Sequence, residues 1–154
     1  MLLNEQIMKV NDEPMNITLS DAIDTISWVE LARVIELAPL GRRDIGKLET
    51  AFRNSEMRCF AYYDGKLIGA GRGISDGALR AAIYDVVVLP QYQGKGIGRM
   101  IMKYLLERAN AEIIMLFANP GKEPFYGKIG FRKMKTAMAI TDNPELLRKK
   151  GLIE

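Results

Sequence analysis

The sequence has no histidine and only one cysteine, Cys59, among its 154 residues. Without an imidazole, Ser-His-Asp and Cys-His nucleophiles and histidine metal sites are excluded. One cysteine permits neither an intramolecular disulfide nor a cysteine metal cluster, so we expect no metal. A single free thiol fits a reducing compartment, which favours a cytoplasmic protein.

Long apolar runs and a strong charge imbalance are also missing. No apolar run reaches the ~18 residues that span a bilayer, and residues 1–13 lack the basic start and apolar stretch of a signal peptide. The 22 basic and 19 acidic residues give a net charge of +3, and the basic residues are dispersed, with Arg148-Lys149-Lys150 typical of a solvated helix end. We therefore expect no membrane and no nucleic-acid partner, whereas a mildly basic protein suits a small polyanionic ligand.

What is present is the composition of a globular domain, with 48% hydrophobic and 27% charged residues. This length normally makes one domain with a self-sufficient core, so residues 1–154 are predicted to form a single domain.

Apolar spacing and turn signals predict the order of elements. An Asp-Gly pair at Asp64-Gly65 between two β-rich runs indicates a hairpin, and Ser27 is placed to cap a helix. The predicted elements are a strand at 17–19, helices at 27–38 and 43–54, a hairpin at 59–70, a strand at 80–89, a helix from 97, a strand at 112–117, a short helix at 124–129 and a strand at 131–140. This order predicts an α/β (α+β) fold with a mixed, mostly antiparallel sheet and helices on both faces.

The segment with chemical information joins the strand Val86–Leu89 to the helix that follows Gly96. A glycine-rich turn at a helix start presents unpaired N–H groups to an anion, most naturally a phosphate. A Walker A loop is excluded because Leu89 stands where its first glycine belongs, and the glycine spacing does not match a dinucleotide fingerprint. The same glycines also serve a tight strand-to-helix turn that binds no ligand.

Two segments resemble the GNAT superfamily of acyl-CoA-dependent N-acetyltransferases. Gln91-Tyr92-Gln93-Gly94-Lys95-Gly96 is similar to the family pattern Arg/Gln-x-x-Gly-x-Gly/Ala, and Asn119 followed by Tyr126-Gly127-Lys128-Ile129-Gly130-Phe131 is similar to its second motif. The resemblance covers about residues 17–140. Lys122 departs from the alanine of many members, and two prolines make the loop after Asn119 unusual.

The resemblance implies a single GNAT-like domain in which a central parallel strand pair, here 85–89 and 112–117, splays apart around acetyl-CoA as co-substrate. The amides of residues 93–99 would hold the pyrophosphate, with added charge from Lys95 and Arg99, and the strand would pair with the pantetheine arm. The implied CoA-binding residues are Val86, Val87, Val88, Gln93, Gly94, Lys95, Gly96, Ile97, Gly98, Arg99, Asn119 and Tyr126.

Catalysis requires a base, because an alkyl amine of pKa ~10 is mostly protonated at pH 7. Without histidine the base is a carboxylate, a tyrosine or a relayed water. Asp85 and Glu123 are the candidates, although both also suit solvated or capping charges, and the amide of Val87 or Val88 is placed to stabilise the oxyanion. The resemblance makes Tyr126 the proton donor to the departing thiolate; the alternative is that it only packs and hydrogen-bonds the sulfur.

We therefore expect an N-acetyltransferase that acts on a primary amine of a small molecule by direct attack in a ternary complex. Acetylation of a protein N-terminus or lysine, and a non-catalytic acyl-CoA-binding module, are the alternatives. The acceptor wall is expected in residues 27–54 and 59–75. Possible contacts there are Trp28, Arg42, Arg43, Tyr62 and Arg72. Family analogy alone adds a homodimer to these expectations.

Overall fold

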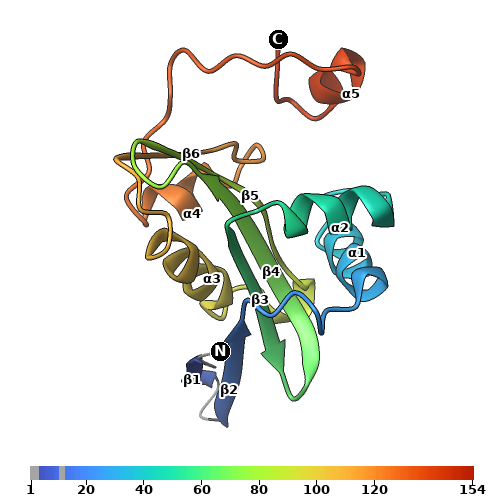
Figure 1. Cartoon of the computed structure of the whole chain (residues 1–154), viewed down its shortest axis with the longest axis vertical. Coiled ribbons are helices and arrows are strands. Elements are labelled where there is room, and N and C mark those ends of the chain that lie inside the picture. The colour runs from blue at the N-terminus through green and yellow to red at the C-terminus, as the bar shows by residue number, and fades with distance from the viewer. Residues whose placement is uncertain (1–3, 11–12) are drawn as a thin grey trace. The chain divides into compact units, whose positions relative to one another are not determined.

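The computed structural model describes residues 4–10 and 13–154, which divide into two compact units, Met1–Leu116 and Phe117–Glu154. Figure 1 labels the elements of both. Segment 1–13, for which the sequence predicts no signal peptide, lies partly outside the described residues. The prediction of one domain for 1–154 stays a prediction.

The first unit contains a six-stranded sheet in the order β1-β2-β3-β4-β5-β6. Neighbouring strands are antiparallel, except for β5 and β6, which are parallel. The strands are β1 Asn4–Val10, β2 Glu13–Ser20, β3 Met57–Tyr63, β4 Lys66–Ser75, β5 Arg80–Val88 and β6 Ile113–Leu116. The predicted strand at 17–19 is thus part of a longer strand, and β1 was not predicted.

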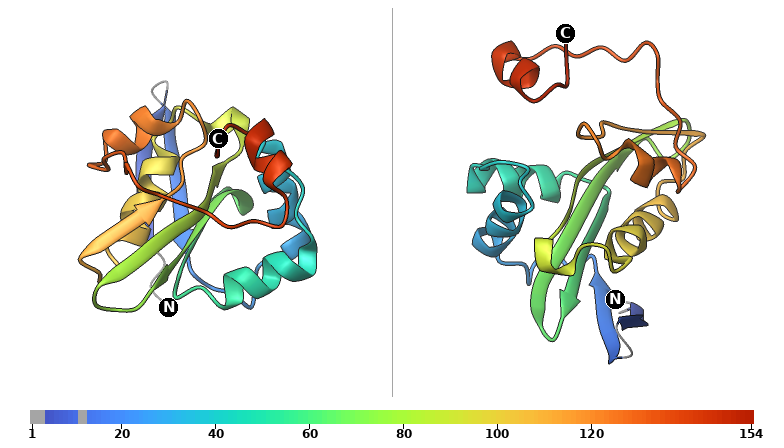
Figure 2. Two further views of the ribbon diagram at one scale, coloured as in Figure 1. Left: turned by 90° about the horizontal axis from the view of Figure 1, so that it is seen from above. Right: turned by 180° about the vertical axis from the view of Figure 1, so that it is seen from behind.

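Three helices cover the two faces of this sheet. Helices α1 (Trp28–Leu37) and α2 (Ile45–Arg53) lie on one face and α3 (Ile97–Leu106) on the other, as Figures 1 and 2 show. The predicted cap at Ser27 is confirmed, since its Oγ accepts a hydrogen bond of 3.3 Å from the Glu30 amide. The predicted fold class is confirmed: a mixed, mostly antiparallel sheet with a parallel pair and helices on both faces.

Local sequence explains the tight connection between β3 and β4. Asp64 and Gly65 both have positive φ, 50° and 72°, which is the conformation of a type I′ turn. The predicted hairpin is therefore confirmed, with the turn at the predicted pair.

Helix α3 lies very close to the backbone of β4. A Cβ at Gly71 would approach Ile101 Cγ2 and Leu105 Cδ1 of α3 to 2.9 Å, and one at Gly69 would approach the Val87 carbonyl oxygen to 2.8 Å. Side chains do not fit at such distances. Because a Cβ at Gly69 would also lie 3.0 Å from Ile101 Cδ1, both glycines let α3 pack closely on β4.

The second unit contains α4 (Glu123–Gly127) and α5 (Pro144–Lys149), with Asn143 capping α5 through a 3.0 Å bond from the Leu146 amide. The strand predicted at 131–140 is wrong: this segment forms no strand, and the side chains of Met138 and Ile140 are essentially fully exposed. A segment forms a strand only where a neighbouring strand pairs with its backbone. As a result the parallel pair β5–β6 lies at one end of the described sheet.

Candidate active site

Strands β5 and β6 pair over only a short length. Their register runs from Arg80 opposite Ile113 to Ile83 opposite Leu116, whereas β5 continues to Val88. Beyond Ile83, the edge of β5 that faced β6 is therefore without that partner. The pairing ends because β6 itself ends at Leu116, so the predicted divergence of 85–89 from 112–117 stays a prediction. An extended amide-bearing ligand is able to pair with such an edge.

The loop after β5 forms an anion cradle, by which we mean residues 93–99. Gly94 and Gly96 have φ of 73° and 83°, and Gly96 is the N-cap of α3 in the left-handed conformation. No side chain caps this helix, whose first backbone bond runs from the Met100 amide to the Gly96 carbonyl. A Cβ at Gly94 would meet nothing within 4 Å. The first-turn amides of α3 thus have no side-chain cap, and the loop before them has room at Gly94, as phosphate binding requires.

Side chains in the cradle have secondary roles. Gln93 Nε2 donates a 2.9 Å hydrogen bond to the Val88 carbonyl, which ties the loop back to the end of β5. Lys95 is half-buried and Arg99 is exposed, so both are free to add positive charge near a bound anion. The cradle is chiefly a backbone structure.

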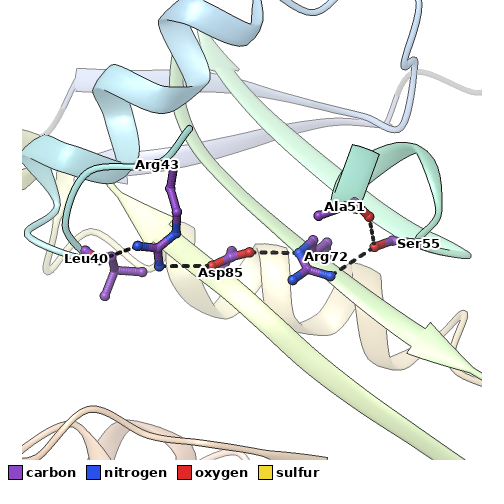
Figure 3. Close-up of polar contacts among 6 residues, drawn as sticks. All are labelled: Leu40, Arg43, Ala51, Ser55, Arg72 and Asp85. Atoms are coloured by element: carbon purple, nitrogen blue, oxygen red, sulfur yellow. Dashed lines mark hydrogen bonds and ion pairs between the residues drawn. The ribbon is translucent and has the colours of Figure 1, made fainter. Parts of the chain in front are cut away.

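Strand β5 bends at Asp85. The register with β4 shifts between Ala70 and Arg72, and Asp85 has φ of 52°. A bulge of this kind re-aims a side chain, and aspartate is among the few residues that tolerate the left-handed region. Asp85 therefore turns toward the face that carries α1 and α2, as Figure 3 shows.

Four side chains meet at this bulge, and we call Arg43, Ser55, Arg72 and Asp85 the Asp85 cluster (Figure 3). Arg72 Nε donates a 2.7 Å hydrogen bond to Asp85 Oδ2, and Arg72 Nη1 donates to Ser55 Oγ at 3.3 Å. Ser55, which is 1% exposed, donates in turn to the Ala51 carbonyl at 2.7 Å. The cluster links the end of α2 to β4 and β5.

The second arginine is held more loosely. Arg43 Nη2 lies 3.6 Å from Asp85 Oδ1, and Arg43 Nη1 donates to the Leu40 carbonyl at 2.9 Å. The side chains of Asp85 and Arg72 are 14% and 15% exposed, whereas that of Arg43 is 34% exposed. Asp85 is thus paired with one arginine and only approached by the other, and its role as a base stays a prediction.

In the second unit, Tyr126 lies in α4 among aromatic rings. Its ring centroid is 4.9 Å from that of Phe125 and 6.1 Å from that of Phe131, both edge-on. Burial raises the pKa of the Tyr126 hydroxyl above its usual value of 10.0, so this hydroxyl keeps its proton at neutral pH. Asn119 precedes this helix, and its carbonyl accepts a 2.9 Å bond from the Lys122 amide.

Glu123 is less suited to act as a base. Hydrogen bonds from its own backbone and from that of Gly121 lower its carboxyl pKa below the usual 4.5. A more acidic carboxyl is a weaker proton acceptor. The N-cap of α4 is Lys122 and no side chain caps the helix, so Glu123 suits a negative charge in the first helical turn rather than a cap.

The other predicted residues are placed as follows. Arg42 is exposed and pairs with Glu36 at 2.9 Å. Trp28 packs at 6.2 Å and a tilt of 57° against the core residue Phe52. Burial raises the pKa of both the Tyr62 hydroxyl and the fully buried Cys59 thiol, which agrees with an inert cysteine.

Sequence reasoning missed Ser55 and Gly71. Ser55 follows the end of α2 and has no local pattern that predicts its contact with Arg72 on another strand. Gly71 lies between Arg72 and Ala70 in an ordinary strand segment, and only the packing of α3 explains it.

Comparisons with known proteins identify the family. Residues 23–131 match the Acetyltransferase (GNAT) family. An uncharacterized N-acetyltransferase ycf52 of Gracilaria tenuistipitata var. liui is 32% identical over 120 residues, covering 73% of this chain and 59% of that protein; a ycf52-like protein of Prochlorococcus marinus is 33% identical over 71% of this chain and 64% of its own length. The chain belongs to the GNAT acetyltransferase family, and it spans about three fifths of the length of these relatives.

Solved structures agree on the fold. A probable acetyltransferase from meticillin-resistant Staphylococcus aureus superposes with a TM-score of 0.73 at 24% identity, covering 81% of this chain and 98% of that one. Arabidopsis thaliana Naa50 in complex with the bisubstrate analogue CoA-Ac-MVNAL gives a TM-score of 0.64 at 25% identity, covering 77% and 85%.

No helix in residues 4–10 and 13–154 has the length and apolarity to cross a membrane.

Proposed function

We propose that the protein transfers the acetyl group of acetyl-CoA to a primary amine of a small molecule, by direct attack in a ternary complex. The observation that carries the proposal is the anion cradle at the end of a strand whose edge has lost its partner. A pyrophosphate at the α3 amides and a pantetheine arm along Val86–Val88 use these two features together. Family membership supports the same ligand.

The proposed reaction balances with groups of this chain. The incoming ammonium loses one proton to Asp85, and the neutral nitrogen attacks the thioester carbonyl carbon. An amide of Val87 or Val88 stabilises the oxyanion while the C–S bond breaks. Tyr126 gives its proton to the leaving thiolate, the nitrogen loses its second proton, and one proton in total is released to water.

A protein acceptor is the second candidate, and the names of relatives support it. A protein of Glycine max that is 34% identical over 104 residues is named histone acetyltransferase TAP1, and the Naa50 structure holds an analogue with a peptide part. The cytoplasmic location and the homodimer also stay proposals, and an Arabidopsis thaliana relative with 30% identity is named chloroplastic.

The cradle is tested by comparing two glycines with the same backbone. Gly94 in the cradle and Gly77 in the turn before β5 have φ of 73° and 76°, and a Cβ on either meets nothing within 4 Å. Gly94→Glu and Gly77→Glu therefore carry a similar strain of about 1–2 kcal/mol, but only the first adds a carboxylate where phosphates would bind.

Thermal unfolding with acetyl-CoA measures the difference, with ATP and NAD as control ligands. At ~100 times its Kd, acetyl-CoA adds about 2.7 kcal/mol of stability, so the wild type and Gly77→Glu should gain several degrees in Tm. Gly94→Glu should gain none. An equal gain in both variants, or none in the folded wild type, would show that the cradle does not bind this ligand.

A further inference from the structure

We propose that Arg43 selects acceptor amines that carry an anionic group, and that engaging this group frees Asp85 for the amine. The inference rests on the proposed function, since it names the acceptor class of the same site. It is carried by the unequal way in which two arginines share one carboxylate.

Arg72 is fixed at the bulge. Besides its 2.7 Å bond to Asp85 and its bond to Ser55, its guanidinium lies 4.9 Å from the ring centroid of Tyr84 and 5.9 Å from that of Phe52. A guanidinium held by a carboxylate, a hydroxyl and two aromatic faces is a structural anchor. Arg72 holds Oδ2 of Asp85 and leaves Oδ1 to another cation.

Arg43 is the cation that faces Oδ1, and little restrains it. Its 3.6 Å separation from Oδ1 is too long for a hydrogen bond, and its one hydrogen bond in the described chain is to the Leu40 carbonyl. It lies in the linker between α1 and α2 rather than on a strand, and its side chain is more than twice as exposed as that of Asp85. Arg43 is therefore able to leave Asp85 for an anion with which it forms a closer ion pair.

The net charge of the Asp85 cluster indicates which kind of group would replace Asp85 as the partner of Arg43. Two guanidinium groups surround one carboxylate, so the cluster carries a net positive charge. A carboxylate or phosphate is able to accept two parallel hydrogen bonds from Arg43, which Asp85 at 3.6 Å does not. A polycationic acceptor, such as a lysine-rich protein segment, is disfavoured by the same charge.

An acceptor that carries both an ammonium and an anionic group is able to contact Asp85 with the first and Arg43 with the second. When Arg43 turns to the acceptor's anion, Asp85 Oδ1 loses its second cation and becomes available to the ammonium of the same molecule. With an amine that has no anionic group, Arg43 would stay beside Asp85, and the amine would have to compete with Arg43 for Oδ1. The acceptor class is therefore a small amino carboxylate or amino phosphate.

The test uses acceptor pairs that differ in the anionic group: leucine with 3-methylbutylamine, and phosphoethanolamine with ethanolamine. Thiol release with acetyl-CoA gives kcat/KM for each, and calorimetry with CoA present gives binding. Wild type should prefer the anionic member of at least one pair by about tenfold or more; the pair that responds distinguishes carboxylate from phosphate.

Arg43→Gln should reverse this preference, lowering kcat/KM and binding for the anionic acceptor and raising kcat/KM for its partner. Arg43→Lys keeps the charge and should keep most of the preference. Arg42→Gln is the matched control, because Arg42 is adjacent, 88% exposed and paired with Glu36, and should leave the ratio unchanged.

Opposite changes in the two members of a pair are not expected from a folding defect. The inference is overturned if Arg43→Gln lowers both members equally, or if wild type neither binds nor acetylates the anionic member preferentially. The proposed function would fail in a different way. Either the protein would not bind acetyl-CoA, or it would acetylate none of the amines although it still bound the anionic member of a pair preferentially.

Discussion

The two ends of the unpaired part of β5 are built in different ways. At its C-terminal end the anion cradle consists mainly of backbone, with positive φ at Gly94 and Gly96 and its charged side chains reaching solvent. At its start the Asp85 cluster consists of side chains from the α1–α2 linker, the end of α2, β4 and β5.

This difference matches what each end is proposed to recognise. A pyrophosphate is the same in every acyl-CoA, and backbone amides bind it whatever the neighbouring side chains are. An acceptor varies from enzyme to enzyme, and side chains are the part of a protein that varies most readily. The cradle should therefore tolerate side-chain changes that the cluster does not.

Tyr126→Phe tests whether the chemistry depends on a group outside both ends of β5. We expect kcat to fall about 10²-fold or more, with acetyl-CoA binding unchanged, because the hydroxyl would act on the leaving thiolate. Since burial raises the Tyr126 pKa, the wild type should lose activity through ionisation of this hydroxyl only above pH 10. Unchanged turnover of the variant at saturating substrates would leave Tyr126 with a packing role.

Asp85→Asn should change the properties of the Asp85 cluster without changing those of the anion cradle. Asparagine tolerates the left-handed backbone, so this change removes the charge without adding strain. We expect kcat/KM for the acceptor to fall about 10–100-fold, the unfolding free energy to fall by about 1–3 kcal/mol as Arg72 loses a charged partner, and the acetyl-CoA Kd to stay constant.

Glu36→Gln is the control for this change, because it breaks the exposed Arg42–Glu36 pair and should cost less than about 1 kcal/mol. Urea unfolding, steady-state kinetics and ligand titration give the three quantities. A weakened acetyl-CoA Kd in Asp85→Asn would show that the two ends are coupled.

Lys95→Met and Arg99→Met should have the smallest effects. Each removes about 0.3–1 kcal/mol of attraction between a positive side chain and the phosphates, so the acetyl-CoA Kd should rise about 2–5-fold, and less at high salt. Titration at two ionic strengths measures both. A loss as large as that of Gly94→Glu would contradict a cradle made of backbone.

The cradle and the cluster also differ in how far the sequence predicts them. Backbone conformation at Gly94 and Gly96 depends on neighbours a few residues away, so a short motif was enough. Asp85, Arg72 and Arg43 were each named from sequence, but their mutual pairing depends on the shift in register between β4 and β5, which no local pattern records.

The errors in secondary structure have a similar cause. Whether residues 131–140 form a strand depends on a partner strand, which their own sequence does not specify. Asp64-Gly65, by contrast, determines its own turn, and that prediction was confirmed.

The close approach of α3 to β4 limits which glycines can be replaced to raise thermal stability. Replacing glycine by alanine commonly stabilises a protein by about 0.4–1 kcal/mol through the entropy of the unfolded chain. At Gly71 the added methyl would lie 2.9 Å from Ile101 Cγ2 and Leu105 Cδ1, so these side chains of α3, the helix that begins at the anion cradle, would have to shift. Gly46 in α2, where the nearest atom to an added Cβ is Asp44 Oδ1 at 3.4 Å, is a glycine at which heat resistance can be raised without moving α3.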